Sequence, residues 1–202
     1  MEKLDLKKTL KELYSARSDV VTAVDVPPAD FLMIDGKGDP NNDPAYAASL
    51  QALYSLAYTM KFGVKKERGT DFTVMPLEGL WWTPDMRDFS ADRKQDWLWT
   101  MMIRMPDFIT QGDVEKARQA AAAKKDLEKL PQVVLAEYDE GAAAQIMHIG
   151  PYAEEAENIA KIHAWIRDNG HALYGKHHEI YMSDPNRTAP EKLKTIIRQP
   201  YS

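Results

Sequence analysis

The sequence predicts an α+β fold built by pseudo-twofold duplication of a strand–helix–strand–strand module, with a ligand groove between the two copies. Three observations predict this fold. Residues 21–38, VTAVDVPPADFLMIDGKG, resemble residues 133–150, VVLAEYDEGAAAQIMHIG, without a gap. A segment with helical apolar spacing follows each of them, and two strand-like segments follow each helix. Packing the copies against each other buries the sheet faces that the helices leave open.

The first copy is expected to span about residues 20–106. Residues 21–38 fit a strand, a tight turn and a second strand. Asp43 suits a helix N-cap, Pro44 suits the first helical position, and Gly63 is the expected stop. The apolar stripe of this helix consists of Leu50, Leu53, Tyr54, Ala57 and Tyr58. Two strands follow, within DFTVMPLEGLWW (71–82) and QDWLWTMMIRMP (95–106).

A connecting helix is expected at about residues 113–130. Asp113 fits its N-terminal cap, an alanine-rich body follows, and Pro131 ends it. The whole chain, residues 1–202, is therefore expected to form a single domain made of two repeats and a connector.

The second copy is expected at about residues 133–200. Residues 133–150 again fit a strand, a turn and a strand, and Pro151 opens the segment that follows. Its helical stripe consists of Ile159, Ile162, His163 and Ile166. Gly170 is the expected C-terminal stop. The last two strands lie within HHEIYMSD (177–184) and KLKTIIRQP (192–200).

The composition excludes several classes of protein. The 202 residues are 44% hydrophobic and 28% charged, which is typical of a globular protein. No apolar run approaches the roughly 18 residues of a membrane span, and the N-terminus lacks a signal-peptide core, so we expect a cytoplasmic protein with no membrane partner. The absence of cysteine excludes disulfides and thiolate metal sites. A net charge of −5 gives no reason to expect nucleic acid.

Each copy carries a glutamate inside an expected strand, which is unusual because strands rarely contain this residue. Glu78 and Glu179 superpose when the copies are aligned by their order of elements. Glu179 shares a strand face with Tyr181, and Glu78 shares one with Trp82. Aromatic rings beside a carboxylate attract cations and electrophiles, and desolvation is expected to raise the carboxyl pKa and so make it a better base.

Two further residues extend the expected aromatic groove. Trp99 and Met101 lie at period two on one face of their strand, and we count both as ligand contacts. The alternative is that these aromatic residues are core, because each ring removes a large area from water. In that case the two acids would point to solvent or pair with Arg104 and Arg198 on the neighbouring strands.

Tyr152 lies where a strand ends and a helix begins, from which its side chain can reach the groove. Trp165, three residues after Ile162, is expected to pack against the sheet instead. No Walker or dinucleotide loop and no G-x-S-x-G elbow is present, so no cofactor and no acyl-enzyme chemistry are expected.

Three histidines are candidate metal ligands. His177 and His178 adjoin Glu179, but adjacent strand residues face opposite ways, so only His177 and Glu179 can share an ion. His148 could supply a third ligand from an earlier strand. We expect no metal, with these histidines forming hydrogen bonds, and we keep His148 among the residues that line the site.

Several long motifs occur in order: LKKTLKELYSARSDV, FLMIDGKGDPN, LEGLWW, IMHIGPYAEE and HHEIYMSDPNRTAPEKLKTIIRQP. Together they resemble the GyrI-like small-molecule-binding family over essentially the whole chain. The resemblance implies tandem strand–helix–strand–strand modules around a ligand groove. It also implies that Glu179 matches the buried strand glutamate that meets cationic aromatic drugs in multidrug-sensing regulators. HHE in place of an isolated acid and the long polar stretch DGKGDPNNDP depart from the family pattern.

The resemblance is stronger to stand-alone members that hydrolyse cyclopropanoid natural products than to the regulators. Only about 20 residues precede the first expected strand, too few for a three-helix DNA-binding unit. The first hypothesis is therefore a hydrolase in which Glu179 activates water, Tyr181 or Tyr152 binds the developing oxyanion, and Trp82 and Trp99 hold the substrate. Glu78 would orient the water or fix the far end of the ligand.

Two other functions stay open. A binding module that only sequesters amphipathic or cationic compounds would use the same residues. A protein–protein role, such as protecting a topoisomerase, would need an exposed apolar patch, which the sequence does not clearly show. The protein partner is unknown.

Overall fold

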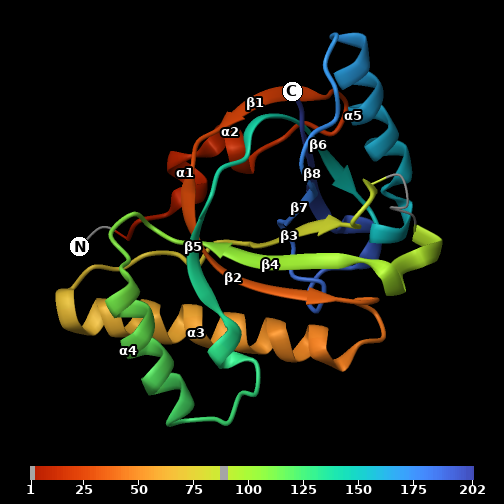
Figure 1. Cartoon of the computed structure of the whole chain (residues 1–202). Helices are drawn as coiled ribbons and strands as arrows, with labels where there is room; N and C mark the ends of the chain where they lie inside the picture. Colours follow the sequence, from red (N-terminus) through yellow and green to blue (C-terminus); the bar gives the residue numbers. More distant parts are fainter. Residues whose placement is uncertain (1–2, 87–90) are drawn as a thin grey trace. The chain divides into compact units, whose positions relative to one another are not determined.

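The computed structural model describes residues 3–86 and 91–202, which form helices and strands (Figure 1). The elements are α1 (Leu6–Thr9), α2 (Lys11–Tyr14), β1 (Thr22–Val26), β2 (Ala29–Lys37), α3 (Pro44–Arg68), β3 (Leu77–Trp82), η2 (Ala91–Asp96), β4 (Leu98–Arg104), α4 (Gln111–Ala122), η3 (Leu130–Gln132), β5 (Val134–Tyr138), β6 (Gly141–Ile149), η4 (Tyr152–Glu154), α5 (Ala156–Asp168), β7 (His177–Tyr181), η5 (Pro190–Lys192) and β8 (Lys194–Pro200). The α+β class is confirmed.

The chain divides into two compact units that do not follow the order of the sequence. Unit 1 consists of Met1–Leu6, Ala29–Met75 and Trp81–Tyr138, and unit 2 consists of Lys7–Pro28, Pro76–Leu80 and Asp139–Ser202. In unit 1 the strands are ordered β4-β2-β5, and in unit 2 they are ordered β1-β6-β8-β7. The first part of β3 follows β7 in unit 2.

The first strand of each copy pairs within the unit of the other copy. In unit 2, β1 pairs antiparallel with β6, and in unit 1, β5 pairs antiparallel with β2. Both expected strands form in each copy, but they do not pair with each other across the short turn. Between β1 and β2 lie Pro27 and Pro28, whose fixed backbone angle cannot supply the positive φ that a two-residue hairpin turn needs.

The registers of these two ladders confirm the duplication. β1 and β6 place Thr22 opposite Gln145. In the gap-free alignment of residue 21 with residue 133, Thr22 corresponds to Val134 and Gln145 corresponds to Met33. Val134 and Met33 are indeed opposite each other in the pairing of β5 with β2. Two unrelated halves would not share a register that the sequence alignment alone predicts.

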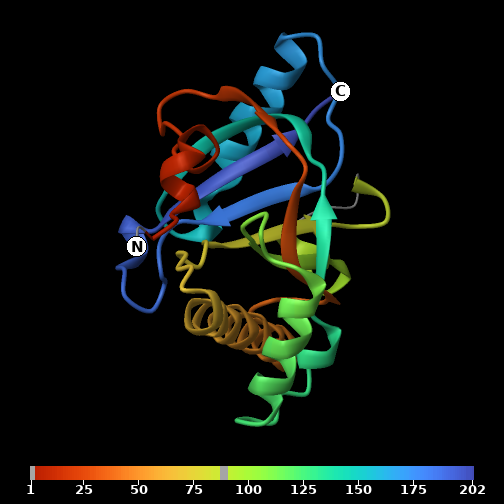
Figure 2. The same ribbon diagram turned by 90° about the vertical axis from the view of Figure 1, so that its left-hand side faces the viewer.

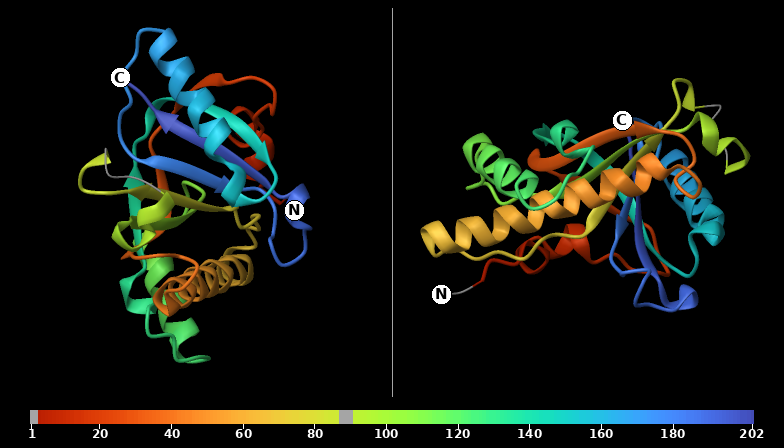
Figure 3. Two further views of the ribbon diagram at one scale, coloured as in Figure 1. Left: turned by 90° about the vertical axis from the view of Figure 1, so that its right-hand side faces the viewer. Right: turned by 90° about the horizontal axis from the view of Figure 1, so that it is seen from below.

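In unit 1, α3 lies along β2 and β4 with α4 beside it (Figures 1 and 3). The side chain of Asp43 accepts a hydrogen bond from the Ala45 N–H and Pro44 is the first helical residue, as expected. The helix does not stop at Gly63, because a single glycine inside a strong apolar stripe costs only about 1 kcal/mol. It ends at Gly69, whose φ of 69° provides a left-handed cap.

The connecting helix differs from the expectation at both ends. Thr110 is the N-cap of α4, and Asp113 is the third helical residue, closing a reciprocal capping box. The helix ends at Ala122, and Pro131 lies instead in η3. Asp113 also forms an ion pair with Arg68, which ties α4 to the end of α3.

In unit 2, helices cover both faces of the strands. Helix α5 lies against β6 and β8 (Figure 3). Its residues Ile162 and Ile166 pack on Ala144, Ile146 and Ile197 of these strands. Trp165 packs against this cluster as expected. The short helix α2 lies beside β8 (Figure 2). Among residues 3–86 and 91–202, no helix combines the length and apolar character that a membrane span requires.

Candidate functional site

Strand β7 presents different chemistry on its two faces. Side chains alternate along a strand, so His177, Glu179 and Tyr181 share one face and His178 and Ile180 point to the other. Glu179 is directly opposite Ile197 of β8, which belongs to the cluster beneath α5. Glu179 therefore lies on the face that α5 covers.

Two neighbours on the same face hold Glu179. The Tyr181 hydroxyl donates to Glu179 Oε2 at 2.8 Å, and His177 Nε2 lies 3.1 Å from Glu179 Oε1. A carboxylate can only accept, so this histidine nitrogen carries the proton. The Glu179 side chain keeps 15% of its surface exposed. The expectation that Glu179 and Tyr181 share a face is confirmed.

Tyr152 of η4 completes this cluster. Its ring meets the Tyr181 ring edge-on, with the centroids 5.7 Å apart. Tyr152 is 41% exposed. Burial of its hydroxyl, followed by the negative charges of Glu155, Glu179 and Asp184, raises the pKa of Tyr152. The phenol therefore keeps its proton at neutral pH and can donate it in a hydrogen bond.

Glu179 is more acidic than the sequence suggested. Burial raises the pKa of Glu179, as expected, but hydrogen bonds from His177, Tyr181 and Glu155 and the charge of His177 outweigh burial and lower it. The expectation of a raised pKa is therefore wrong. Glu179 is ionised at neutral pH because its donors stabilise the charged form.

The opposite face of β7 belongs to a buried charged network. The ring nitrogens of His178 lie 2.8 Å from Glu140 Oε1 and 3.0 Å from Glu78 Oε2. The other oxygen of Glu78 accepts a 2.8 Å hydrogen bond from the Tyr14 hydroxyl. Since both ring nitrogens meet carboxylates, His178 is an imidazolium.

Arg198 of β8 is the second cation of this network. It donates to Glu140 Oε2 at 3.1 Å, to Gln145 Oε1 at 2.9 and 3.1 Å, and to the Leu13 carbonyl of α2 at 2.6 Å. Burial raises the pKa of Glu140, but the charges of His178 and Arg198 more than reverse this and lower it to about 2. Two cations and two carboxylates thus compensate each other inside unit 2.

The two strand acids do not share a face. Glu78 contacts His178, whose side chain points away from that of Glu179, and Glu78 is only 1% exposed. Glu78 and Glu179 are therefore aligned in sequence, but they have different neighbours in unit 2. Neither acid pairs with the arginines considered in the alternative reading, since Arg198 binds Glu140 and Arg104 lies over the Phe31 ring. A ligand contact by Glu78 stays a prediction.

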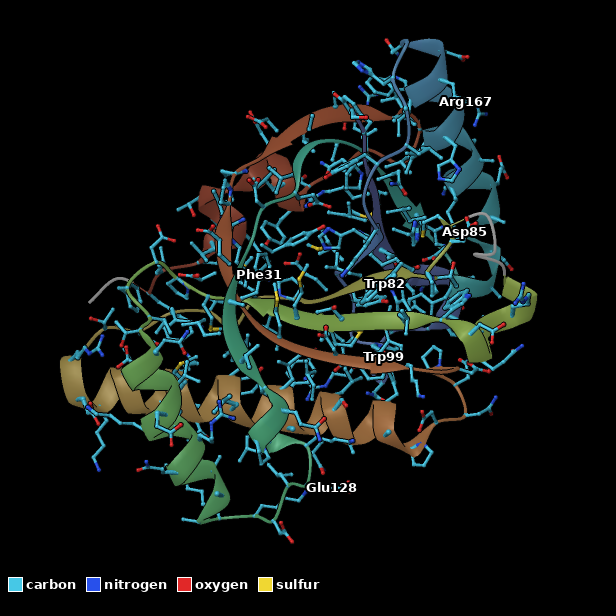
Figure 4. The ribbon with its side chains drawn as sticks, in the orientation of Figure 1. Phe31, Trp82, Asp85, Trp99, Glu128 and Arg167 are labelled. Atoms are coloured by element: carbon cyan, nitrogen blue, oxygen red, sulfur yellow. The ribbon has the colours of Figure 1, made fainter. Side chains whose placement is uncertain are left out.

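In unit 1, Trp99 lies on the α3 side of β4 (Figure 4). Met101 follows two residues later on the same strand and shares this face. Trp99 meets Tyr46 of α3 edge-on at 5.2 Å, and its ring fills the space above Gly36, where a Cβ would lie 2.1 Å from it. Both residues are buried. Their role as ligand contacts is untested, and the described contacts agree with the core alternative.

Trp82 differs from Trp99. Its neighbour Trp81 meets Tyr46 and Trp97 on the α3 side, so the alternation of β3 turns Trp82 to the other side. Trp82 is only partly buried. Trp82 therefore lies on the strand face that α3 does not cover, unlike Trp99.

His148 of β6 forms two hydrogen bonds, and its place among the residues that line the site stays a prediction. Its Nδ1 accepts a hydrogen bond from Asn158 of α5 at 3.1 Å, so its Nε2 carries the proton and donates to the Pro151 carbonyl at 3.0 Å. These bonds fix the turn that carries Tyr152. Within residues 3–86 and 91–202, no group of three or more His, Asp or Glu could hold a metal ion.

Sequence reasoning missed two acids. Glu155 lies just before α5, and its spacing of four and seven residues to Ile159 and Ile162 places it on the apolar stripe. That spacing is a signal that could have found it. Glu140 adjoins Gly141 in the segment YDEG, which is typical of a turn, so nothing local indicated its burial.

The chain has close structural relatives. The model of the GyrI-like small molecule binding domain matches residues 20–202. An uncharacterized conserved protein from Listeria innocua is 39% identical, with a TM-score of 0.92 over 99% of this chain and 100% of its own. A Listeria innocua protein described as a hydrolase is 38% identical, with a TM-score of 0.89 over all of both chains. The C-terminal domain of EcmrR, at 12% identity and a TM-score of 0.58 over 91% of this chain and 97% of its own, shares the fold. No curated protein matches the chain.

Proposed function

Because the chain belongs to the GyrI-like small-molecule-binding domain family, we propose that it binds amphipathic aromatic compounds and hydrolyses electrophilic, cyclopropane-bearing ones by adding water. The description of a 38% identical Listeria innocua relative as a hydrolase supports this proposal. The observation that carries it is the ionised Glu179 carboxylate, fixed by two donors and still partly exposed. The biological role that follows is detoxification of alkylating compounds.

Glu179 acts as the general base. A water molecule beside its carboxylate loses a proton as the water oxygen attacks a carbon of the strained ring. The carbon–carbon bond of the ring breaks, and its electron pair moves toward a conjugated carbonyl oxygen. Because ring strain supplies much of the driving force, a carboxylate whose lowered pKa makes it a weak base is enough.

The tyrosines orient the reacting groups. The Tyr181 hydroxyl already donates to Glu179 and so fixes the direction in which the carboxylate accepts the water proton. Tyr152 is more exposed, and its protonated phenol can form a hydrogen bond to the developing oxyanion. Their rings contribute aromatic surface for a flat substrate.

The second candidate function is sequestration without turnover. A negative carboxylate next to two tyrosine rings attracts a cationic aromatic compound, at about 0.5–2 kcal/mol for each cation–π contact. Multidrug binding of this kind uses the same residues, so turnover has to separate the two functions.

The test uses purified protein and a cyclopropane-bearing alkylator, followed by mass spectrometry. We expect many product molecules per protein, each heavier by one water. Glu179→Gln should still bind the compound but lose turnover by about 10²-fold or more, the usual contribution of a general base. Glu157→Gln, on the exposed side of α5 and paired with Lys161, is the matched control and should retain activity.

Two results would overturn the assignment. Unchanged turnover by the Glu179 variant would remove its role as base. Stoichiometric capture of the compound by the wild-type protein, without release of a hydrated product, would establish sequestration instead.

A further inference from the structure

A second carboxyl group meets Glu179 in unit 2. Glu155 follows η4, and its backbone N–H bonds to the Tyr152 carbonyl at 3.3 Å, which anchors the turn. Glu155 is only 5% exposed, and its side chain is hydrogen-bonded to Glu179. Ionised carboxylates contain acceptors but no donor, so a bond between two carboxyl groups requires a proton shared by them.

The surroundings of the pair decide which residue holds this proton. Glu179 already accepts from His177 and Tyr181, and two donors stabilise an ionised carboxylate strongly. Two carboxyl groups in one site do not both ionise readily, so the better-solvated or better-bonded one carries the charge. Glu179 is that group.

We infer that Glu155 holds the shared proton and is the proton donor of the reaction in which Glu179 is the base. This inference rests on the proposed function and adds a second catalytic residue to it. Paired carboxyl groups whose environments differ divide the roles of acid and base in this way.

The step balances. Glu179 takes one proton from water while the water oxygen forms a bond to the ring carbon and the ring carbon–carbon bond breaks. Glu155 gives its proton to the carbonyl oxygen that receives the electron pair, and the product is the substrate plus one water. Glu179 is then protonated and Glu155 ionised. A proton passing along their hydrogen bond restores the starting state without solvent.

Other titratable groups surround the pair and contribute to any pH dependence. They are His177 and Tyr181 on β7, Tyr152 in η4, His163 on α5 and Asp184 after β7. Their presence means that a pH profile of the wild-type protein alone does not identify Glu155. A change in the profile on replacing Glu155 does.

The experiment compares Glu155→Gln with Glu154→Gln. Glu154 is the preceding residue and is exposed, so its replacement alters the charge of the turn without entering the pair. With a cyclopropane-bearing carbonyl compound, Glu155→Gln should lower kcat by about 10²-fold, leave binding within about threefold, and remove the fall in kcat at alkaline pH. Glu154→Gln should match the wild type in all three.

A second readout needs no substrate. In the infrared spectrum at neutral pH, the wild type and Glu154→Gln should show the carbonyl band of a buried, protonated carboxylic acid, and Glu155→Gln should lack it. Absence of the band from the wild type would overturn the shared proton. With the band present, unchanged kcat in Glu155→Gln would overturn the donor role.

A wild-type protein that binds the compound without turnover would refute the hydrolase and with it the donor role. The infrared band would still decide where the proton resides. Failure of the proposed function and failure of the carboxyl pair are thus separate results.

Discussion

Stability should depend on pH through His178. Burial lowers the pKa of this imidazole. The charge and hydrogen bond of Glu140, followed by those of Glu78, more than reverse this effect and raise the pKa to about 9. The folded pKa thus exceeds the unfolded value of 6.5. For a group of this kind the stabilisation is complete below pH 6.5 and is lost as pH rises through about 9.

The magnitude follows from the two pKa values. A rise from 6.5 to about 9, at about 1.4 kcal/mol for each tenfold change in proton affinity, corresponds to about 3 kcal/mol of unfolding free energy. Glu140 gives the opposite dependence at acid pH, where stability falls as pH drops from 4.5 through about 2. The pKa shifts of His178 and Glu140 both report the ion pair between these residues, so the two stabilisation energies do not add.

Urea unfolding followed by tryptophan fluorescence measures this directly. Between about pH 6 and about pH 9.5, the wild-type free energy of unfolding should fall by about 3 kcal/mol more than that of His178→Gln. His171→Gln changes an exposed histidine of the same unit and should follow the wild type. If His178→Gln does not fold, titration of the His178 ring by NMR in the wild type gives the same answer.

Two outcomes would contradict a charged, buried His178. One is a wild-type free energy that changes over this range no more than that of His178→Gln. The other is a ring titration near pH 6.5, which would show that the buried imidazole does not carry its charge to alkaline pH.

Two further predictions concern glycines of unit 1. Gly36→Ala should destabilise the protein by about 1–3 kcal/mol in urea unfolding, because the new methyl group meets the Trp99 ring at 2.1 Å; full stability would show that the ring is free to move. Gly63→Ala should stabilise it by about 0.5–1 kcal/mol, because the site lies inside α3 with no atom within 4 Å of a Cβ, and a loss of stability would contradict a continuous helix there.

Local patterns predicted the elements well because their causes are local. Asp43 and Pro44 started α3 as expected, since capping depends on a few adjacent residues. The alternation of β7 correctly placed His177, Glu179 and Tyr181 on one face, because a strand has a fixed period of two. The neighbours of Glu179 on its own strand could thus be predicted from residues 177–181 alone.

Partners distant in sequence were not predictable in the same way. Nothing near Glu140 indicates Arg198 or His178, which are brought to it by the pairing of β6, β8 and β7. The pairing of β1 with β6 likewise depends on long-range burial, although Pro27 and Pro28 argued against a hairpin. The pKa of Glu179 was misjudged because burial was considered without the donors that accompany it.

The exchange of β1 and β5 has a consequence for how such a protein can arise. A chain holding only one copy could satisfy both ladders by associating with a second, identical chain, since the two pairings are equivalent under the internal alignment. Joining the genes end to end would make that association independent of protein concentration. It would also free the copies to diverge: residues 177–179 read HHE, whereas the aligned residues 76–78 of the first copy read PLE.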